Sequence, residues 1–205
     1  ALTVKESEVT DMLRGLAAKP ALVITDSQAV REVAAAVPED IRLTTFSTLF
    51  ARYKGDFAAQ LAGAAAIDTL KDGDRVLIAE GCSHHVTCDD IGRVKIPNWM
   101  KKYTGRELKF EWTQGADFPD NLEDYALVVH CGGCMLNRAE VRRRINECAR
   151  QGVKVTNYGI VISKMQGVLE RVVKGIADAG ATGSVSDTGS ISDTGSISDT
   201  GEEGD

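Results

Sequence analysis

The chain lacks the features that mark exported and membrane proteins. None of its 205 residues belong to an apolar run long enough to span a membrane. Its first residues, Ala1-Leu2-Thr3-Val4-Lys5-Glu6, are mixed and charged rather than a signal peptide. Five cysteines are an odd number, which argues against a framework of disulfides. We therefore expect a cytoplasmic protein whose thiols stay reduced.

An overall basic balance is also lacking. The formal net charge is −6, and residues 179–205 contain six acids and no Lys or Arg, so the rest of the chain balances 24 acids against 24 bases. This composition is not that of a nucleic-acid binder. The sequence has no G-x-x-x-x-G-K-[ST] phosphate loop and no nucleophile elbow. We expect neither GTP hydrolysis nor another hydrolytic activity.

Soft metal ligands are concentrated between Cys82 and Cys134. This stretch contains all three histidines of the chain and four of its five cysteines. These ligands are Cys82, His84, His85, Cys88, His130, Cys131 and Cys134. Because thiolates bind both zinc and iron–sulfur clusters, and imidazole is a common further ligand of zinc, the pattern indicates a thiolate metal site.

The second half of this stretch reads as strand, ligand turn and helix in immediate succession. The apolar run 126–129 predicts a buried strand, and His130-Cys131-Gly132-Gly133-Cys134 follows it directly. Two cysteines three apart can face one metal, and the glycines between them permit a sharp turn. Asn137 suits the N-cap of a helix that begins at Arg138, with Glu140 completing a capping box.

The first half repeats this design. Residues 75–79 form an apolar run, and Cys82 and His84 lie just beyond it. In an open α/β sheet, ligands bind beyond the carboxyl ends of the strands. Both groups of ligands are therefore expected at the same edge of a sheet. On chemistry alone, three thiolates with one histidine suit a structural zinc site as well as an iron–sulfur cluster. A site closed by a fourth thiolate from Cys88 would instead favour electron transfer.

The remaining sequence alternates strand and helix patterns, which predicts an α/β fold of two small parallel-sheet βαβ, Rossmann-like domains. Strands are expected at 21–25 and 41–46, one long helix from Leu49 to near Leu70, and a last helix from Ile162 to Ile176. We predict a dimerisation domain over residues 1–72, whose open sheet edge would pair with another copy, and a cluster-binding domain over 73–179. The alternative is that the strands of the first segment join the sheet of the cluster-binding domain. Residues 180–205 repeat a polar six-residue unit and predict a disordered acidic tail.

Several residues near the ligands have simpler interpretations. Cys148 lies on the apolar stripe of a helix, which favours core packing. Asp89 and Asp90 read as loop acids. A local basic excess follows Cys134, which is most simply a solvated face but could dock an acidic partner or attract an anionic cluster. Its members are Arg138, Arg142, Arg143, Arg144, Arg150 and Lys154. Arg138 is the best candidate, because it is nearest to Cys134.

The spacing Cys82-x-His84, 45 intervening residues, and His130-Cys131-x-x-Cys134 resembles the signature of the HydF family, the GTPase and scaffold proteins of [FeFe]-hydrogenase maturation. Residues 88–97 also resemble that family, whereas the first 70 residues do so only loosely. The resemblance implies a 4Fe–4S cluster held by Cys82, Cys131 and Cys134, with His84 or His130 near the exchangeable position. It also implies a diiron subcluster precursor with CO and cyanide ligands as cargo.

The same resemblance implies partners and a role. The chain would act as a homodimeric carrier rather than as a catalyst. It would receive its cargo from the radical-SAM maturation enzymes and deliver it to apo-[FeFe]-hydrogenase, without a nucleic acid or a membrane as partner. A structural zinc module and an electron-transfer iron–sulfur protein are the alternative functions.

Overall fold

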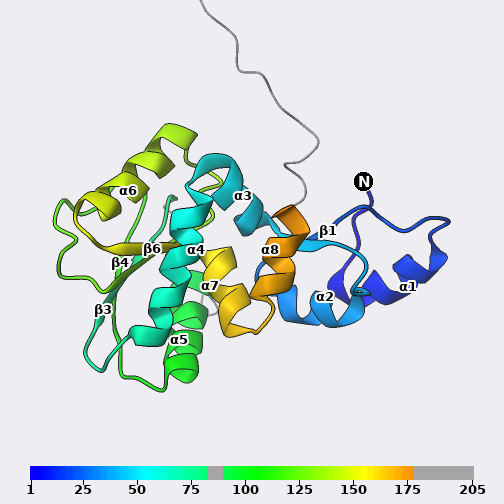
Figure 1. The fold of residues 1–205 in the computed structure, drawn as a ribbon, viewed down its shortest axis with the longest axis horizontal. Coiled ribbons are helices and arrows are strands. Elements are labelled where there is room, and N and C mark those ends of the chain that lie inside the picture. The colour runs from blue at the N-terminus through cyan, green and yellow to red at the C-terminus, as the bar shows by residue number, and fades with distance from the viewer. Residues whose placement is uncertain (83–89, 178–205) are drawn as a thin grey trace, which may run out of the picture.

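The computed structural model of this protein describes residues 1–82 and 90–177. Its α/β architecture contains two small parallel sheets, as predicted (Figure 1). The smaller sheet pairs β1 (Val23–Thr25) with β2 (Leu43–Thr45). The larger has the order β4 (Lys109–Thr113), β3 (Arg75–Ala79), β5 (Leu127–His130), β6 (Lys154–Asn157). The predicted tail at 180–205, together with His84, His85, Cys88 and Asp89, lies outside the described residues.

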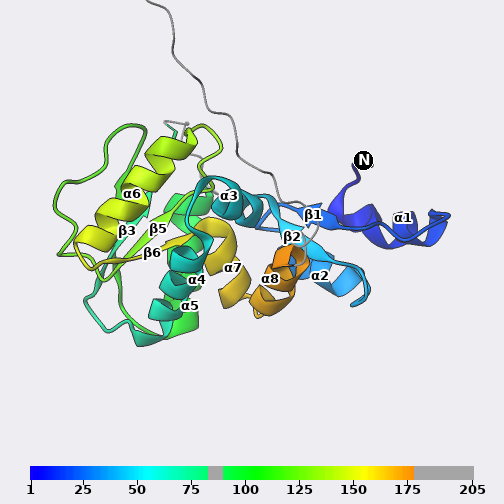
Figure 2. The ribbon, with the colours of Figure 1, turned by 45° about the horizontal axis from the view of Figure 1, so that its top comes forward.

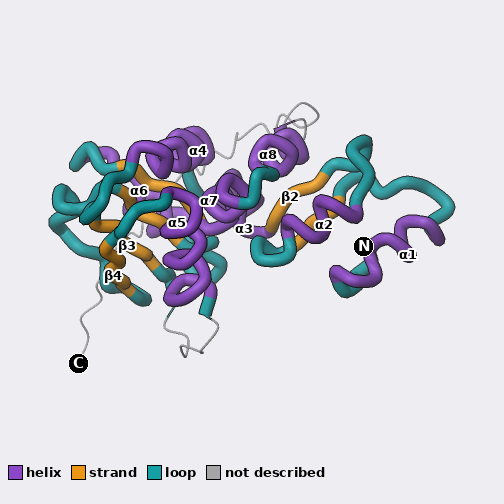
Figure 3. Tube along the Cα trace, turned by 90° about the horizontal axis from the view of Figure 1, so that it is seen from below, coloured by secondary structure: helices purple, strands orange, loops and turns teal. Residues whose placement is uncertain are grey.

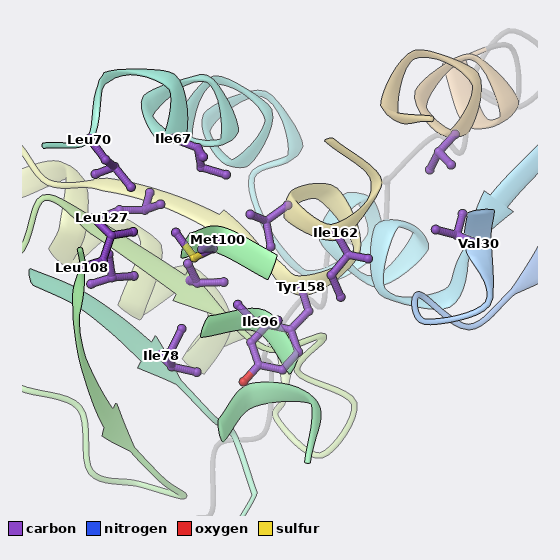
Figure 4. Packing of buried hydrophobic residues seen from close by; sticks show 14 residues of the cluster. Val30, Ile67, Leu70, Ile78, Ile96, Met100, Leu108, Leu127, Tyr158 and Ile162 are labelled. Atoms are coloured by element: carbon purple, nitrogen blue, oxygen red, sulfur yellow. The ribbon is translucent and has the colours of Figure 1, made fainter. Parts of the chain in front are cut away.

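The larger sheet is covered on both faces, which explains the continuous apolar runs in its strands. Val76 and Ile78 of β3 face a core shared with α5 (Ile96–Thr104) and α7 (Tyr158–Met165). Leu77 and Ala79 face the opposite core, against α6 (Arg138–Arg150). Figure 2 shows α6 on one side of the sheet, with α5 and α7 on the other. Figure 4 shows the first core, which extends from Leu108 to Val30 of α2 (Val30–Ala36) and so reaches the smaller sheet.

Two glycines allow helices to cover sheet edges at very short range. Gly63 of α4 (Phe57–Ala65) lies directly on β6, where an added Cβ would be 1.9 Å from the carbonyl oxygen of Val155. Gly175 of α8 (Leu169–Ala177) lies on β2 in the same way, 2.0 Å from the carbonyl oxygen of Leu43. Covering an edge strand prevents unwanted pairing there. Within the described residues, the free edge of the smaller sheet is therefore that of β1.

Two of the predicted helices are each divided in two. The helix expected from Leu49 to near Leu70 is α3 (Phe46–Lys54) followed by α4 and a short 3-10 turn. The break comes because the chain turns at Gly55 and the Asp56 side chain caps α4 by accepting from the Ala59 amide at 2.9 Å. The last helix is α7 followed by α8, because Gly167 has a φ of +74°. Both breaks fall at glycines within otherwise continuous apolar patterns, so periodicity alone concealed them.

Helices connect the two sheets. At the amino-terminal end, α2 packs against β2 of the smaller sheet, and η1 (Glu6–Glu8) leads into α1 (Val9–Gly15), which packs against α2. The helix η2 (Ala66–Thr69) and the π-helix η3 (Ile91–Lys95) belong to the larger unit. Figure 3 shows α3, α7 and α8 between the two ends. Packing thus crosses residue 72, since α4 contacts β6 and α8 contacts β2. The predicted boundary at 72 stays a prediction.

Candidate metal centre

The carboxyl ends of all four parallel strands meet in one row. Ala79 of β3 pairs with Thr113 of β4 and with His130 of β5, and His130 pairs with Asn157 of β6. The Cys131 amide continues the ladder by donating to the Ala79 carbonyl at 2.8 Å. The two ligand segments predicted from the sequence therefore leave neighbouring strands at the same edge, because parallel strands all end on the same side.

Cys131 is a partly buried thiol at this edge, and two backbone amides point at its sulfur. Its Sγ accepts hydrogen bonds from the Gly81 amide at 3.0 Å and from the Gly133 amide at 3.3 Å. Burial raises the pKa of the Cys131 thiol, and the two amides oppose that rise. Amides that point at a sulfur favour its thiolate form and are typical of thiolate metal sites.

Cys82 and Cys134 are the two other candidate thiols that the structure describes near Cys131. Both lie close enough for their charge to raise the Cys131 pKa further. Cys82 is partly buried, whereas Cys134 is exposed on the loop. Within residues 1–82 and 90–177, no three His, Cys, Asp or Glu side chains are arranged as a finished metal-ion ligand group. The donor chemistry fits a soft metal or an iron–sulfur cluster, and the thiols would have to converge on binding.

Glycines are required at this edge by close packing. An added Cβ at Gly81 would lie 2.7 Å from Cγ of Leu136 and 3.4 Å from the Cys131 sulfur. At Gly132 it would lie 3.1 Å from the Ser47 hydroxyl of α3. Gly133 has a φ of +65°, a left-handed conformation that glycine adopts without strain. The turn between Cys131 and Cys134 is thus shaped by its glycines, as predicted.

His130, a predicted cofactor-binding residue, is only 1% exposed. Its Nδ1 lies 2.8 Å from the Cys131 carbonyl oxygen, and its buried Nε2 has no hydrogen-bond partner. Burial lowers the pKa of His130 to about 4, so the ring is neutral at pH 7. The charges of Arg144 and Glu140 also act on it, so the ring neighbours α6. The other predicted histidine, His84, lies outside the described residues.

Arg138 is the first residue of α6 and is exposed. Asn137 caps the helix by accepting from the Glu140 amide at 2.8 Å. The return half of the predicted capping box is not observed, because the Glu140 carboxylate binds Arg143 and Arg144 instead. Arg144 was predicted on an exposed basic face, but its side chain is 1% exposed and donates to the Gly115 carbonyl. Arg144 is held inside the fold because its Nε donates to the Glu140 carboxylate and its Nη2 to the Gly115 carbonyl, while its buried Nη1 has no hydrogen-bond partner among the described residues.

Cys148 lies in the core between α6 and the sheet, as predicted from its helical stripe. Burial raises the pKa of its thiol to about 12, so it is a neutral thiol at pH 7. Because it lies in the core and away from the sheet edge, Cys148 is a suitable control in experiments that replace the candidate ligand cysteines.

Sequence reasoning missed a buried polar group at the carboxyl end of β3, one residue after the strand. The Glu80 side chain is 2% exposed, and it accepts from the Tyr158 hydroxyl at 3.3 Å and from Gln114 Nε2 at 3.2 Å. Arg93 of η3 lies 3.7 Å from the same carboxylate. Burial, together with the charges of Glu80 and Cys131, raises the pKa of Tyr158 well above 10. A charged residue following an apolar strand, two positions before Cys82, was the available signal.

The fold and this edge define an α/β protein with cysteine thiols gathered at the carboxyl end of a parallel sheet. Comparison with protein families identifies it further. Residues 1–55 match the hydrogen maturase F dimerization domain and residues 58–175 match the hydrogen maturase F tetramerization domain. The chain belongs to the hydrogen maturase F family. No curated protein matches it.

Family membership confirms the resemblance inferred from the cysteine spacing and gives the chain a role in hydrogenase maturation. Both matched domains are association domains and neither is a GTPase domain, and they support self-association of the chain. Among the described residues, no helix combines the length and apolarity needed to cross a membrane.

Proposed function

We propose that this chain binds a 4Fe–4S cluster through Cys82, Cys131 and Cys134 and carries a diiron subcluster precursor to apo-[FeFe]-hydrogenase. The observation that carries the proposal is the Cys131 sulfur, which accepts two backbone amides at the sheet edge with Cys82 and Cys134 beside it. A cluster held by three cysteines has one iron open to a ligand from outside. The chain acts as a carrier in the cytoplasm rather than as a catalyst.

The residues of the chain have separate roles in this function. The amides of Gly81 and Gly133 hold the Cys131 sulfur and neutralise part of its charge. The neutral ring of His130 contacts the backbone of Cys131, with its Nδ1 2.8 Å from the Cys131 carbonyl oxygen. His84 belongs to the same ligand segment as Cys82. The Arg138 guanidinium lies at the amino-terminal end of α6 and attracts the anionic, cyanide-bearing cargo.

Self-association, in this proposal, uses the free edge of β1 to form a homodimer. Helix α8 covers the other edge of the small sheet through Gly175, which leaves β1 as the edge available to a second copy. Ile24 in β1 is 40% exposed, so an apolar side chain is also presented there. Apo-[FeFe]-hydrogenase and the radical-SAM maturation enzymes are the proposed heterologous partners.

The deciding experiment is anaerobic reconstitution with iron and sulfide, followed by metal and sulfide analysis and EPR. Wild-type protein and the Cys148→Ala variant should both take up about four irons and four sulfides per chain, the stoichiometry of the proposed cluster. Cys131→Ala should lose the cluster and its reduced-state EPR signal. Cyanide or imidazole should perturb the wild-type signal, because one iron is exchangeable.

Zinc binding in the same reconstitution experiment would contradict the proposed cluster. One tightly bound zinc with no cluster uptake would overturn the carrier proposal and leave a structural metal module. A signal that cyanide and imidazole both leave unchanged would indicate a closed cluster and would favour electron transfer.

A further inference from the structure

We propose that Lys54 is the positioning residue that holds the Cys131–Cys134 loop in its ligand-bearing conformation. Its role in cluster retention rests on the proposed cluster function, whereas its role in the loop conformation does not. Lys54 is the last residue of α3, and it lies within the segment that matches the dimerization domain. The loop belongs to the segment that matches the tetramerization domain.

The contact uses the full donor capacity of a lysine. Lys54 Nζ donates to the carbonyl oxygens of Gly133 at 2.9 Å, Cys134 at 3.1 Å and Leu136 at 2.7 Å. A lysine ammonium has three N–H donors, so one side chain gathers three carbonyls of a single loop. Hydrogen bonds from a charged donor are stronger than those between neutral groups.

The loop has a physical need for this cation. Its left-handed Gly133 and the Leu136 amide, which donates to the Gly133 carbonyl at 3.1 Å, turn the backbone tightly. Carbonyl oxygens directed at one point repel each other unless a positive group lies between them. The same loop carries Cys134, so the charge of Lys54 also lies near a thiol that becomes anionic when it binds a metal.

The rest of α3 keeps Lys54 in place. Its ammonium lies 4.9 Å from the centre of the Phe50 ring, one turn earlier in α3. At the opposite end of α3, the Ser47 carbonyl accepts from Asn157 Nδ2 at 2.9 Å, and the Ser47 side chain packs against Gly132. One helix therefore contacts both the beginning and the end of the ligand loop, and Lys54 supplies the charged contact.

The first test uses the protein without metal. Lys54→Met keeps most of the aliphatic stem and removes the charge and its donors, and Lys54→Arg keeps a cation. Arg52→Met is the matched control, because Arg52 is exposed on the same helix. Alkylation of Cys131 and Cys134, followed by peptide mass spectrometry, should be faster in Lys54→Met than in wild type. Hydrogen exchange of the amides of residues 133–136 should also be faster.

The second test uses the reconstituted protein. Loss of a residue that orients a metal ligand commonly costs about 10–100-fold in metal affinity, so in competition with a chelator Lys54→Met should hold iron about 10–100-fold less tightly than wild type. Its cluster should also have a more negative midpoint potential, since a nearby positive charge favours the reduced cluster. Lys54→Arg should recover part of both effects.

Equal alkylation, hydrogen exchange and iron affinity in Lys54→Met and Arg52→Met would overturn the proposal. If circular dichroism shows that Lys54→Met does not fold, Lys54→Gln replaces it, because glutamine keeps a neutral donor. The same comparison with Arg52→Met then tests the role of Lys54. Failure of wild-type protein to take up a cluster would overturn the proposed function alone, because the measurements without metal still decide the role of Lys54.

Discussion

The Gly81 amide donates a hydrogen bond to the Cys131 sulfur at 3.0 Å, although 50 positions separate them in the chain. The Cys131 amide in turn donates to the Ala79 carbonyl. These two bonds fix Cys131 to the end of β3 from both sides. They follow from parallel pairing of β3 with β5, which places the residues after both strands in contact.

Gly81→Ala should therefore disturb the thiol edge. The new methyl group would lie 2.7 Å from Cγ of Leu136, so Leu136 must move and carry the loop with it. Overpacking of this kind costs about 1–3 kcal/mol of unfolding free energy, and cluster uptake should fall in parallel. Gly15→Ala, at an exposed site with nothing within 4 Å, is the control and should leave both unchanged. Urea denaturation and iron analysis measure the two effects.

Gly63→Ala tests the packing of α4 on β6. A Cβ at this position would overlap the Val155 carbonyl, which belongs to rigid backbone, so the helix must lift from the strand. We expect a loss of about 3 kcal/mol or more in unfolding free energy. Ala62→Ser, an exposed neighbour on α4, should change it by less than about 0.5 kcal/mol. Comparable stabilities in urea for the two variants would contradict the packing.

Acid should destabilise the fold partly through Glu140. Hydrogen bonds from Arg143 and Arg144 lower the Glu140 pKa to about 2 in the folded state, from an ordinary value of 4.5. The folded carboxylate thus stays ionised where the unfolded one binds a proton. Its contribution to stability is complete above pH 4.5 and is lost as the pH falls toward 2. Because the side chain is 26% exposed, we expect only about 1–2 kcal/mol.

Glu140→Gln should flatten this dependence when unfolding free energy is measured in urea between pH 7 and pH 3. Glu107→Gln is the matched control, since its 86% exposed side chain pairs with Lys101 at the surface. An acid slope in Glu140→Gln as steep as that of wild type would show that Glu140 does not cause it.

Arg138→Gln should weaken retention of an anionic cargo on reconstituted protein. Arg138 is exposed beside the ligand loop, so its attraction is screened by water, and we expect about a two- to fivefold change in affinity. Arg142→Gln, exposed one turn further along α6, should change it less. Equilibrium dialysis with a synthetic diiron dicyanide complex at low salt measures both variants. An equal effect in the two would assign the attraction to net charge rather than to Arg138.

Sequence patterns alone were enough to predict the class of fold, the family and the edge at which the candidate ligands meet. Local patterns were sufficient for this, because short apolar runs followed by cysteines mark strand ends, and parallel strands bring such ends together. The Cys82, Cys131 and Cys134 spacing led to the hydrogen maturase F family, which the family comparison confirmed. The assignment of these cysteines as cluster ligands stays a prediction.

The positions of helix breaks and the long-range polar contacts could be seen only in the folded protein. Gly55 and Gly167 divide helices whose apolar stripes continue across them, because a break depends on what packs on either side. Arg144 looked like part of a basic surface, yet partners at Glu140 and Gly115 hold it inside. Lys54 lies 79 to 82 positions from the carbonyls that it binds. Contacts of this range leave no local periodicity, so no reading of neighbouring residues could place them.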